Sequence, residues 1–305
     1  MDFLKFLQGL RNPFFDGFFS IITYLGDEVL FMATGLLLYW CIDKKKGYYI
    51  LSVGLIGTVI NQFLKLAFRI PRPWVQDPEF KIVESAREAA TGYSFPSGHT
   101  QSSVGMFSSI LITAKKNWLK IVCIVLMVLV PFSRLYLGVH TLLDVGVSFI
   151  IALILAIGLY PVFNKENKTA IRLLFTIMIL FDICFLVYAH IYKFPSDIDM
   201  VNLTGGITNG YKIMGCLIGL WCSYEIDSKF TKFKTDAPIH MQILKFVLGI
   251  IPVVLIKSLL KSPLYALIGN YYIADSIRYL LICLFAGTIW PMTFKYFNKT
   301  KKGNE

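Results

Sequence analysis

Residues 142–162 read LLDVGVSFIIALILAIGLYPV, a stretch in which Asp144 is the only charged side chain. A helix needs about 20 mostly apolar residues to cross the hydrocarbon core of a bilayer, and this stretch has that length. The carboxylate stands at its start, and the residues that follow are almost all apolar. The stretch therefore predicts a transmembrane helix that begins beside an ionisable group.

The whole chain has the composition of a membrane protein. Of its 305 residues, 56% are hydrophobic and 16% are charged, and the mean hydropathy is +0.62, well beyond the values of ordinary soluble domains. Further apolar stretches of suitable length, separated by short polar loops, are 25–42, 48–68, 98–114, 118–137, 170–191, 206–224, 241–259 and 272–294. The sequence thus predicts an all-α fold, a polytopic membrane helical bundle of about nine transmembrane helices.

The lysines and arginines predict how this bundle is oriented. Cytoplasmic loops retain positive charge, and clusters of basic residues follow every second predicted span. These clusters are Lys44, Lys45 and Lys46; Lys115, Lys116 and Lys120; Lys165, Lys168 and Arg172; Lys229, Lys232 and Lys234; and Lys295, Lys299, Lys301 and Lys302. We expect the N-terminus outside and the C-terminus in the cytoplasm. The formal charge of +11 is then a topology signal, and no nucleic-acid partner is predicted.

The ends of the chain differ from its middle. Residues 3–22 place many Phe and Leu residues among Lys5, Arg11 and Asp16, a pattern typical of a helix that lies in the membrane interface. No cleaved signal peptide is expected. We predict an interfacial N-terminal helix over 1–24, a six-helix catalytic core over 25–192, and three additional transmembrane helices of unknown role over 193–305. In the long outer loop, Glu79 to Ala90 is predicted to form a short surface helix that serves as a lid.

Three polar motifs interrupt the apolar pattern, and the predicted topology puts all three on the outer face. The first motif joins Lys65 to Arg72 and Pro73 at the end of the second span. Seven residues are close to two helical turns, so the two cations can face one spot, although Pro71 and Pro73 end the regular helix nearby. The alternative is that both side chains snorkel and anchor the helix end.

The second motif is Pro96-Ser97-Gly98-His99 at the start of the third span. Glycine allows the backbone to approach a ligand closely, and the first N–H groups of a helix remain free. Such a helix end suits a phosphate group. The alternative is an ordinary capped helix with an interfacial histidine.

The third motif runs from Ser133 and Arg134 to His140 and Asp144, between the fourth and fifth spans. His140 and Asp144 are one helical turn apart, so the carboxylate can accept a hydrogen bond from one imidazole nitrogen and leave the other nitrogen free to attack. This is the arrangement of a nucleophile with an orienting partner. A proton relay or a buried structural pair is the alternative.

Together the motifs read K-x6-R-P, P-S-G-H and S-R-x5-H-x3-D, and in this the chain resembles the type-2 phosphatidic acid phosphatase superfamily, which includes the vanadium haloperoxidases. Every diagnostic position is present, in the same order. The nine spans with an outside N-terminus also resemble the arrangement of glucose-6-phosphatase and the sphingosine-phosphate phosphatases. The last three spans carry no motif of this family.

The resemblance implies a role for each matching residue. His140 is the nucleophile that forms a phosphohistidine, Asp144 orients it, and His99 protonates the leaving oxygen. The phosphate oxygens are held by Lys65, Arg72, Ser97, Gly98 and Arg134. Three fixed cations take the place of metal ions, so activity without a divalent metal, and without any cofactor, is expected.

The leading hypothesis for the substrate is a lipid phosphate or diphosphate, because a site at the outer interface meets a head group whose tail stays in the bilayer. A soluble phosphate monoester, transfer of phosphate to another lipid or sugar hydroxyl, and a transporter or scaffold with a relic site are the alternatives. Short loops and a Lys- and Ile-rich composition favour a bacterial plasma membrane with the site on the extracytoplasmic side. The oligomeric state, the exact substrate and the source organism are left open.

A few charged residues elsewhere have two interpretations each. Arg69 assists the phosphate site or anchors the membrane interface, and we favour the anchor. In the later spans, charged or titratable side chains either pair structurally or line a path for the substrate; they are Asp182, His190, Asp275 and Arg278.

Overall fold

The computed structural model describes residues 1–297, and within this range it contains helices and loops but no strand. The predicted all-α fold is confirmed. Lys299, Lys301 and Lys302, three of the predicted cytoplasmic charges, lie outside the described residues. The chain divides into two compact units: unit 1 comprises 1–32, 52–161 and 193–206, and unit 2 comprises 33–51, 162–192 and 207–305.

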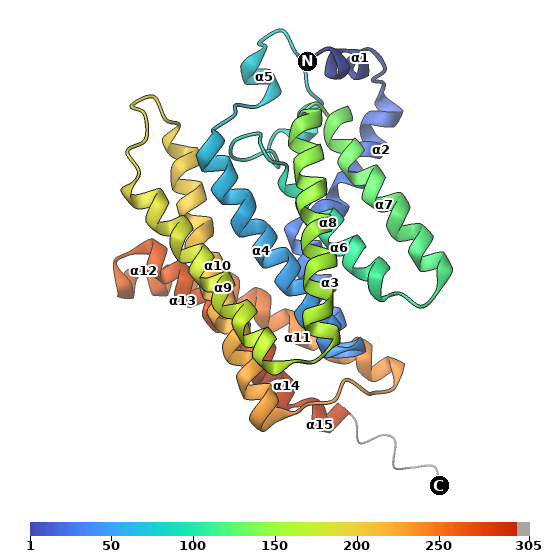
Figure 1. Cartoon of the computed structure of the whole chain (residues 1–305), viewed down its shortest axis with the longest axis vertical. Helices are drawn as coiled ribbons and strands as arrows, with labels where there is room; N and C mark the ends of the chain where they lie inside the picture. The colour runs from blue at the N-terminus through green and yellow to red at the C-terminus, as the bar shows by residue number, and fades with distance from the viewer. Residues whose placement is uncertain (298–305) are drawn as a thin grey trace. The chain divides into compact units, whose positions relative to one another are not determined.

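Unit 1 contains the three polar motifs. Its helices, drawn mainly in blue to green in Figure 1, are α1 (Asp2–Gly9), α2 (Pro13–Thr23), the 3-10 turn η1 (Tyr24–Gly26), the start of α3 (Glu28–Leu37), most of α4 (Lys44–Phe68), α5 (Pro73–Gln76), η3 (Glu84–Ala86), α6 (Gly98–Thr113), α7 (Asn117–Tyr136), most of α8 (Leu142–Asn164) and the first turns of α10 (Met200–Ile226). The helices α6 and α7 form an antiparallel pair, and α1 and α2 also pack against α7.

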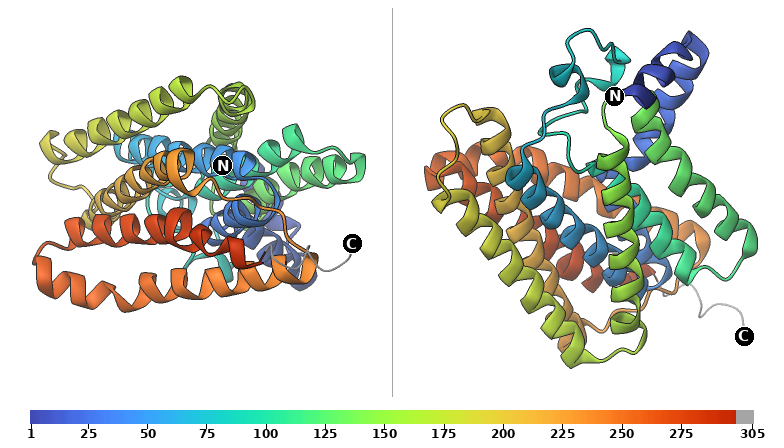
Figure 2. Two further views of the ribbon diagram at one scale, coloured as in Figure 1. Left: turned by 90° about the horizontal axis from the view of Figure 1, so that it is seen from below. Right: turned by 45° about the horizontal axis from the view of Figure 1, so that its top comes forward.

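Unit 2 consists of the remaining helices. They are the rest of α3, η2 (Leu38–Ile42), the first turns of α4, the end of α8, α9 (Lys168–Ile191), the rest of α10, η4 (Asp227–Thr231), α11 (Ile239–Leu259), α12 (Lys261–Ile268), α13 (Tyr271–Leu284), η5 (Phe285–Ile289), α14 (Trp290–Met292) and α15 (Phe294–Phe297). The helices α11 and α13 lie side by side (Figure 2, left).

The helices identify the chain as a multi-pass membrane protein. Within residues 1–297, six helices are long and apolar enough to cross a bilayer, and a seventh span results if α2 and α3, which meet at 49°, count as one broken span. All nine predicted stretches are largely helical, but those that form α6 and α10 are not among the six. The helix α6 has only 16 residues, fewer than the roughly 20 of a full span. The number nine and the orientation of the termini therefore stay predictions.

The N-terminal segment forms two helices where the sequence pattern predicts one. The helix α1 ends at Gly9. Asn12 caps α2, because its side-chain oxygen accepts a hydrogen bond from the Phe15 N–H group at 3.1 Å and Pro13 stands at the first helical position. Leu4 and Leu7 of α1 are buried in a cluster with residues of the outer loop and of α7. Part of the apolar face is thus covered by protein, and a position in the membrane interface remains a prediction.

The outer loop is held by contacts with its surroundings. Of the predicted helix from Glu79 to Ala90, only the turn η3 forms. The Arg11 guanidinium donates hydrogen bonds to the carbonyls of Tyr136, at 2.9 Å, and of Lys81. The Val83 N–H group donates to the Leu137 carbonyl at 3.1 Å. The loop is thereby tied to the residues that precede His140, and its role as a lid stays a prediction.

In unit 2, the structural interpretation applies to one charged pair. The Arg278 guanidinium lies 2.5 Å from the Asp275 carboxylate, which also accepts a hydrogen bond from the Tyr265 hydroxyl at 3.0 Å. Asp182 is buried, and neither of its carboxylate oxygens has a hydrogen-bond partner within the part of the chain that the structure describes. The Nδ1 atom of His190 lies 2.9 Å from the carbonyl of Leu186, one turn earlier in α9.

Candidate active site

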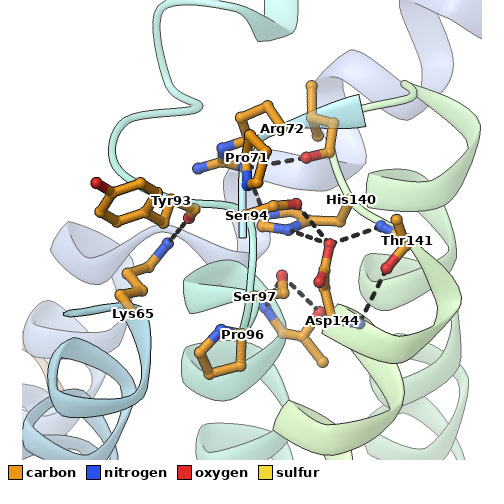
Figure 3. Close-up of polar contacts among 12 residues, drawn as sticks. Lys65, Pro71, Arg72, Tyr93, Ser94, Pro96, Ser97, His140, Thr141 and Asp144 are labelled. Atoms are coloured by element: carbon orange, nitrogen blue, oxygen red, sulfur yellow. Dashed lines mark hydrogen bonds and ion pairs between the residues drawn. The ribbon is translucent and has the colours of Figure 1, made fainter. Parts of the chain in front are cut away.

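The two cations of the first motif are brought together by a neighbouring loop. The helix α4 ends at Phe68, and Arg69 takes a left-handed conformation with φ of 51°, so helical spacing alone does not align Lys65 with Arg72. Instead both cations donate to consecutive carbonyls of the outer loop. Lys65 Nζ donates to the Tyr93 carbonyl (Figure 3). Arg72 donates through Nε to the Gly92 carbonyl at 3.0 Å and through Nη2 to the Thr91 carbonyl at 2.6 Å.

Arg72 also touches the predicted nucleophile. Its Nη1 atom lies 2.9 Å from His140 Nε2 and 2.9 Å from the Val139 carbonyl. A guanidinium group only donates hydrogen bonds, so Nε2 must accept, and the proton of a neutral imidazole is then on Nδ1. The nitrogen that would attack phosphorus therefore faces a fixed cation, and the other nitrogen carries its proton toward Asp144.

Asp144, in the first turn of α8, is held in front of the imidazole. Its Oδ2 atom lies 3.5 Å from His140 Nδ1, slightly longer than a normal hydrogen bond. The same oxygen accepts hydrogen bonds from the Ser94 hydroxyl at 2.5 Å and from the Thr141 N–H group at 2.7 Å (Figure 3). Both His140 and Asp144 are almost fully buried. The two side chains are therefore brought together, but the predicted hydrogen bond from Nδ1 to the carboxylate is not formed. Ser94 is a further contact of Asp144 that the motifs do not include.

The second motif starts α6 next to the third motif. The Ser97 hydroxyl accepts hydrogen bonds from the N–H group and the hydroxyl of Thr100, at 3.4 and 3.0 Å, so Ser97 caps the helix, as the alternative interpretation stated. Its own O–H is still able to donate to a ligand. The Ser97 N–H group donates to the Asp144 main-chain carbonyl at 3.1 Å, which joins the two motifs. A Cβ atom on Gly98 would meet nothing within 4 Å.

Arg134 enters the site from the last turn of α7. The side chain is completely buried, and its Nη1 atom donates to the Thr23 hydroxyl of α2 at 2.7 Å. Its Nε and Nη2 atoms have no hydrogen-bond partner among residues 1–297. A buried guanidinium with donors left over is costly unless an acceptor completes it. Arg134 therefore has the donors that a phosphate group needs.

The charges of the site act on both histidines. Lys65, Arg72 and Arg134 each interact electrostatically with His99 and with His140, and the two imidazoles interact with each other. His140 lies in the loop between α7 and α8. Burial of its imidazole, followed by the positive charges of Arg72, Arg134 and Lys65, holds the pKa of His140 well below its ordinary value. The predicted nucleophile is therefore neutral at physiological pH, as attack on phosphorus would require.

The eight residues predicted from the sequence thus converge on one site in unit 1. This site offers three cations, the N-terminus of α6, the buried His140 imidazole, whose Nε2 atom is a hydrogen-bond acceptor, and the imidazole of His99. Such a set can hold a tetrahedral anion and attack it. Groups of three or more His, Cys, Asp or Glu side chains that would hold a metal ion do not occur among the described residues.

Sequence reasoning missed two side chains of the site. Ser94 lies only three residues before Ser97, and a hydroxyl so close to a motif is a signal that it contributes to it. Thr23 lies far from every motif in sequence, in a segment predicted to rest in the membrane interface, and nothing in the sequence pattern points to it.

Comparisons with known proteins agree with the motifs. The PAP2 superfamily model matches residues 45–168, which include all three motifs. A second family model, described as the transmembrane extension of PAP2 superfamily phosphatases, matches residues 211–302. The two matches together run through most of the chain beyond residue 44. Helices that carry no motif are thus also shared with phosphatases of this kind.

The relatives are phosphatases by name. Human sphingosine-1-phosphate phosphatase 2 is 25% identical over 274 residues, which cover 83% of this chain and 66% of that protein. The dihydrosphingosine 1-phosphate phosphatase of Schizosaccharomyces pombe is 24% identical over 298 residues, with 90% of this chain and 69% of that protein covered. The undecaprenyl-diphosphatase BcrC of Bacillus subtilis is 28% identical over 161 residues, 50% of this chain and 79% of that protein. With its motifs, its converging site and these matches, the chain belongs to the PAP2 superfamily of membrane phosphatases.

Proposed function

We propose that the chain hydrolyses a lipid phosphate or lipid diphosphate through a phosphohistidine formed on His140, without a divalent metal. The observation that carries the proposal is the position of the His140 imidazole. Its Nε2 atom faces Arg72 at 2.9 Å, and its Nδ1 atom faces Asp144 at 3.5 Å. Only a neutral imidazole held in this way presents a lone pair to an anion that cations have already bound.

The first chemical step joins His140 to phosphorus. Nε2 forms the N–P bond while the bond from phosphorus to the leaving oxygen breaks, and His99 gives its proton to that oxygen. Arg72 donates to Nε2 in the structure, so this hydrogen bond must pass to a phosphate oxygen before the attack. Arg134 contributes through its two unpaired donor atoms, and Lys65 adds a point charge.

The second step releases phosphate. A water molecule attacks the phosphohistidine on the side opposite Nε2, His99 accepts its proton, and the N–P bond breaks to give inorganic phosphate and neutral His140. Throughout both steps Asp144 stabilises the positive charge that develops on the imidazole. Ser94 and Thr141 keep the Asp144 carboxylate in place.

A lipid substrate is favoured by the setting of the site. Lys65 and Asp144 belong to helices long and apolar enough to cross a bilayer, and each lies near one end of its helix. A head group can enter at such a position while its acyl or isoprenyl tail stays in lipid. The names of the relatives, which refer to sphingoid phosphates and to a polyprenyl diphosphate, support the same class, and we place the site on the extracytoplasmic side.

The test is phosphate release by the purified chain in detergent micelles. We expect release from long-chain lipid phosphates or diphosphates to exceed release from water-soluble sugar phosphates, with His140→Ala as the inactive control. Faster hydrolysis of soluble esters would assign the site to that class instead. A phosphorylated acceptor in place of free phosphate would show a phosphotransferase.

The intermediate can be tested separately. In His99→Ala, transfer from an activated ester such as p-nitrophenyl phosphate still proceeds, because this leaving group needs no proton, whereas hydrolysis of the phosphoenzyme is slowed. We expect protein-bound phosphate that is stable to base and labile to acid, and none in a variant that also lacks His140. Rapid turnover with no trapped phosphate in any quench would contradict the phosphohistidine.

A further inference from the structure

The corner between α2 and η1, residues Thr23 to Gly26, touches two motifs of the candidate active site. It is called the N-terminal corner below. The helix α2 packs along α7, which carries Arg134 (Figure 2, right). The turn η1 packs against α6, which carries His99. The PAP2 superfamily model matches from residue 45 onward, so the N-terminal corner lies outside the residues that this model matches.

The first contact fixes a cation. The Thr23 hydroxyl accepts a hydrogen bond from Arg134 Nη1 at 2.7 Å, and both side chains are buried. A guanidinium group is planar, so fixing one nitrogen restricts the directions in which the others donate. Nε and Nη2 of Arg134 are the atoms that lack a partner within residues 1–297. Asp27, which follows the corner, adds an electrostatic interaction with the same guanidinium. Thr23 thus aims the two free donors of Arg134.

The second contact fixes the proposed acid. A Cβ atom on Gly26 would lie 2.9 Å from the His99 carbonyl oxygen and 3.1 Å from His99 Cβ. Real Cβ atoms essentially never come this close to a backbone oxygen, so glycine allows η1 to lie directly against the first turn of α6. The position of the His99 backbone therefore depends on the absence of a side chain at Gly26.

From these two contacts we infer that the N-terminal corner is part of the catalytic apparatus: Thr23 positions Arg134 for the phosphate, and Gly26 positions His99 for the leaving oxygen. The inference rests on the proposed phosphatase function. It assigns the N-terminal corner a role in catalysis, beyond attachment to the membrane surface. Both residues are positioning residues, because neither touches the reacting atoms.

The Thr23 variants separate positioning from packing. Thr23→Val keeps the shape of the side chain but leaves Arg134 Nη1 without an acceptor, whereas Thr23→Ser keeps the acceptor and loses only a methyl group. Because the lost hydrogen bond involves a charged group, we expect kcat/KM to fall about 10- to 100-fold in Thr23→Val. Weaker competitive inhibition by inorganic phosphate should accompany it. Thr23→Ser should stay within about threefold of the wild type.

The Gly26 variant has a different signature. A Cβ atom at residue 26 would collide with the His99 carbonyl and with Val130 Cγ1, each at 2.9 Å. We therefore expect Gly26→Ala to slow formation of the phosphoenzyme from a lipid phosphate, whose alkoxide needs a proton, far more than its formation from p-nitrophenyl phosphate, with both measured as the rate of the first turnover. Gly17→Ala is the matched control, because Gly17 lies in α2 and a Cβ atom there meets nothing within 4 Å. It should behave as the wild type on both substrates.

The outcomes are distinct. Loss of turnover in Thr23→Val with recovery in Thr23→Ser, together with a leaving-group-dependent loss in Gly26→Ala, supports the inference. Equal kinetics in Thr23→Val and wild type, or an equal loss of the first-turnover rate on both substrates in Gly26→Ala, overturns it while the phosphatase itself still works. A wild-type protein that releases no phosphate from any substrate refutes the proposed function instead. Thermal unfolding of each variant in the same detergent identifies a loss of activity that is caused by unfolding. If Thr23→Val is unfolded, the comparison of Thr23→Ser with the wild type tests the inference instead.

Discussion

Replacing Asp144 by Asn removes one charge from the site and leaves the shape of the side chain almost unchanged. The amide oxygen can still accept from Ser94 and Thr141, which donate to Oδ2 at 2.5 and 2.7 Å. What is lost is the attraction between the carboxylate and the charge that develops on His140, 3.5 Å away. At an effective dielectric constant of about 20, this attraction is about 5 kcal/mol. Since about 1.4 kcal/mol corresponds to a factor of ten in rate, kcat should fall about a thousandfold.

The assay is the initial rate of phosphate release from a long-chain lipid phosphate in mixed micelles, at saturating substrate. We expect KM to change little, because Arg72, Arg134 and Lys65 still hold the phosphate group. Asp77→Asn is the matched control: it is the same chemical change in the outer loop, where Asp77 pairs with Lys5 at 2.7 Å, and it should leave turnover unchanged.

The reasoning is refuted if Asp144→Asn keeps a kcat within about tenfold of the wild type while its melting temperature is unchanged. The carboxylate would then have no part in stabilising the imidazole. A large rise in KM at constant kcat would also contradict it, because this result assigns Asp144 to binding of the ground state.

Three further outcomes follow from the same geometry. Ser94→Ala removes a buried donor to Asp144 and should lower kcat about 10- to 100-fold, the effect of losing a hydrogen bond to a charged group. Ser94→Thr keeps the hydroxyl and should retain most of the wild-type kcat. Because the pKa of His140 is held below its ordinary value, the imidazole loses its proton at a lower pH. The acid limb of the pH profile of kcat/KM, corrected for titration of the substrate, should therefore lie below about pH 6.5. An acid limb above pH 7 would contradict this. Turnover should survive dialysis against EDTA, and activity that only magnesium restores would disprove the metal-independent mechanism.

The sequence predicted the site because its chemistry depends on short-range spacing. His140 and Asp144 are four positions apart; His140 precedes α8 and Asp144 lies in its first turn, and the structure brings their side chains together. Ser97 and Gly98 start a helix where the motif predicts one. Each of these relations involves residues only a few positions apart, for which the local backbone sets the geometry.

The relations that sequence reasoning missed join residues far apart in the chain. Lys65 and Arg72 converge because the carbonyls of residues 91–93 accept from both, and a carbonyl has no signature in sequence. Thr23 is 111 positions from Arg134, and a threonine among apolar residues looks the same in a surface helix as in a catalytic one. Tertiary contacts of this kind follow only from the folded chain.

The number of spans shows a different limit. Hydropathy correctly located the apolar helices, since all nine predicted stretches are largely helical. Whether a stretch such as α6 crosses the whole bilayer depends on its length and its neighbours. With 16 residues, α6 reaches about 24 Å at 1.5 Å per residue, less than the roughly 30 Å of the hydrocarbon core.

The hydrogen bonds of Arg72 have a consequence for the end of the reaction cycle. Four of its five N–H groups are occupied by Thr91, Gly92, Val139 and His140. When inorganic phosphate departs, His140 Nε2 can again accept the hydrogen bond from Arg72 Nη1. The guanidinium group therefore keeps an acceptor for this N–H group. We therefore expect the returning imidazole to assist dissociation of the product. The same contact that covers the predicted nucleophile would then favour rapid clearance of the site over tight retention of phosphate.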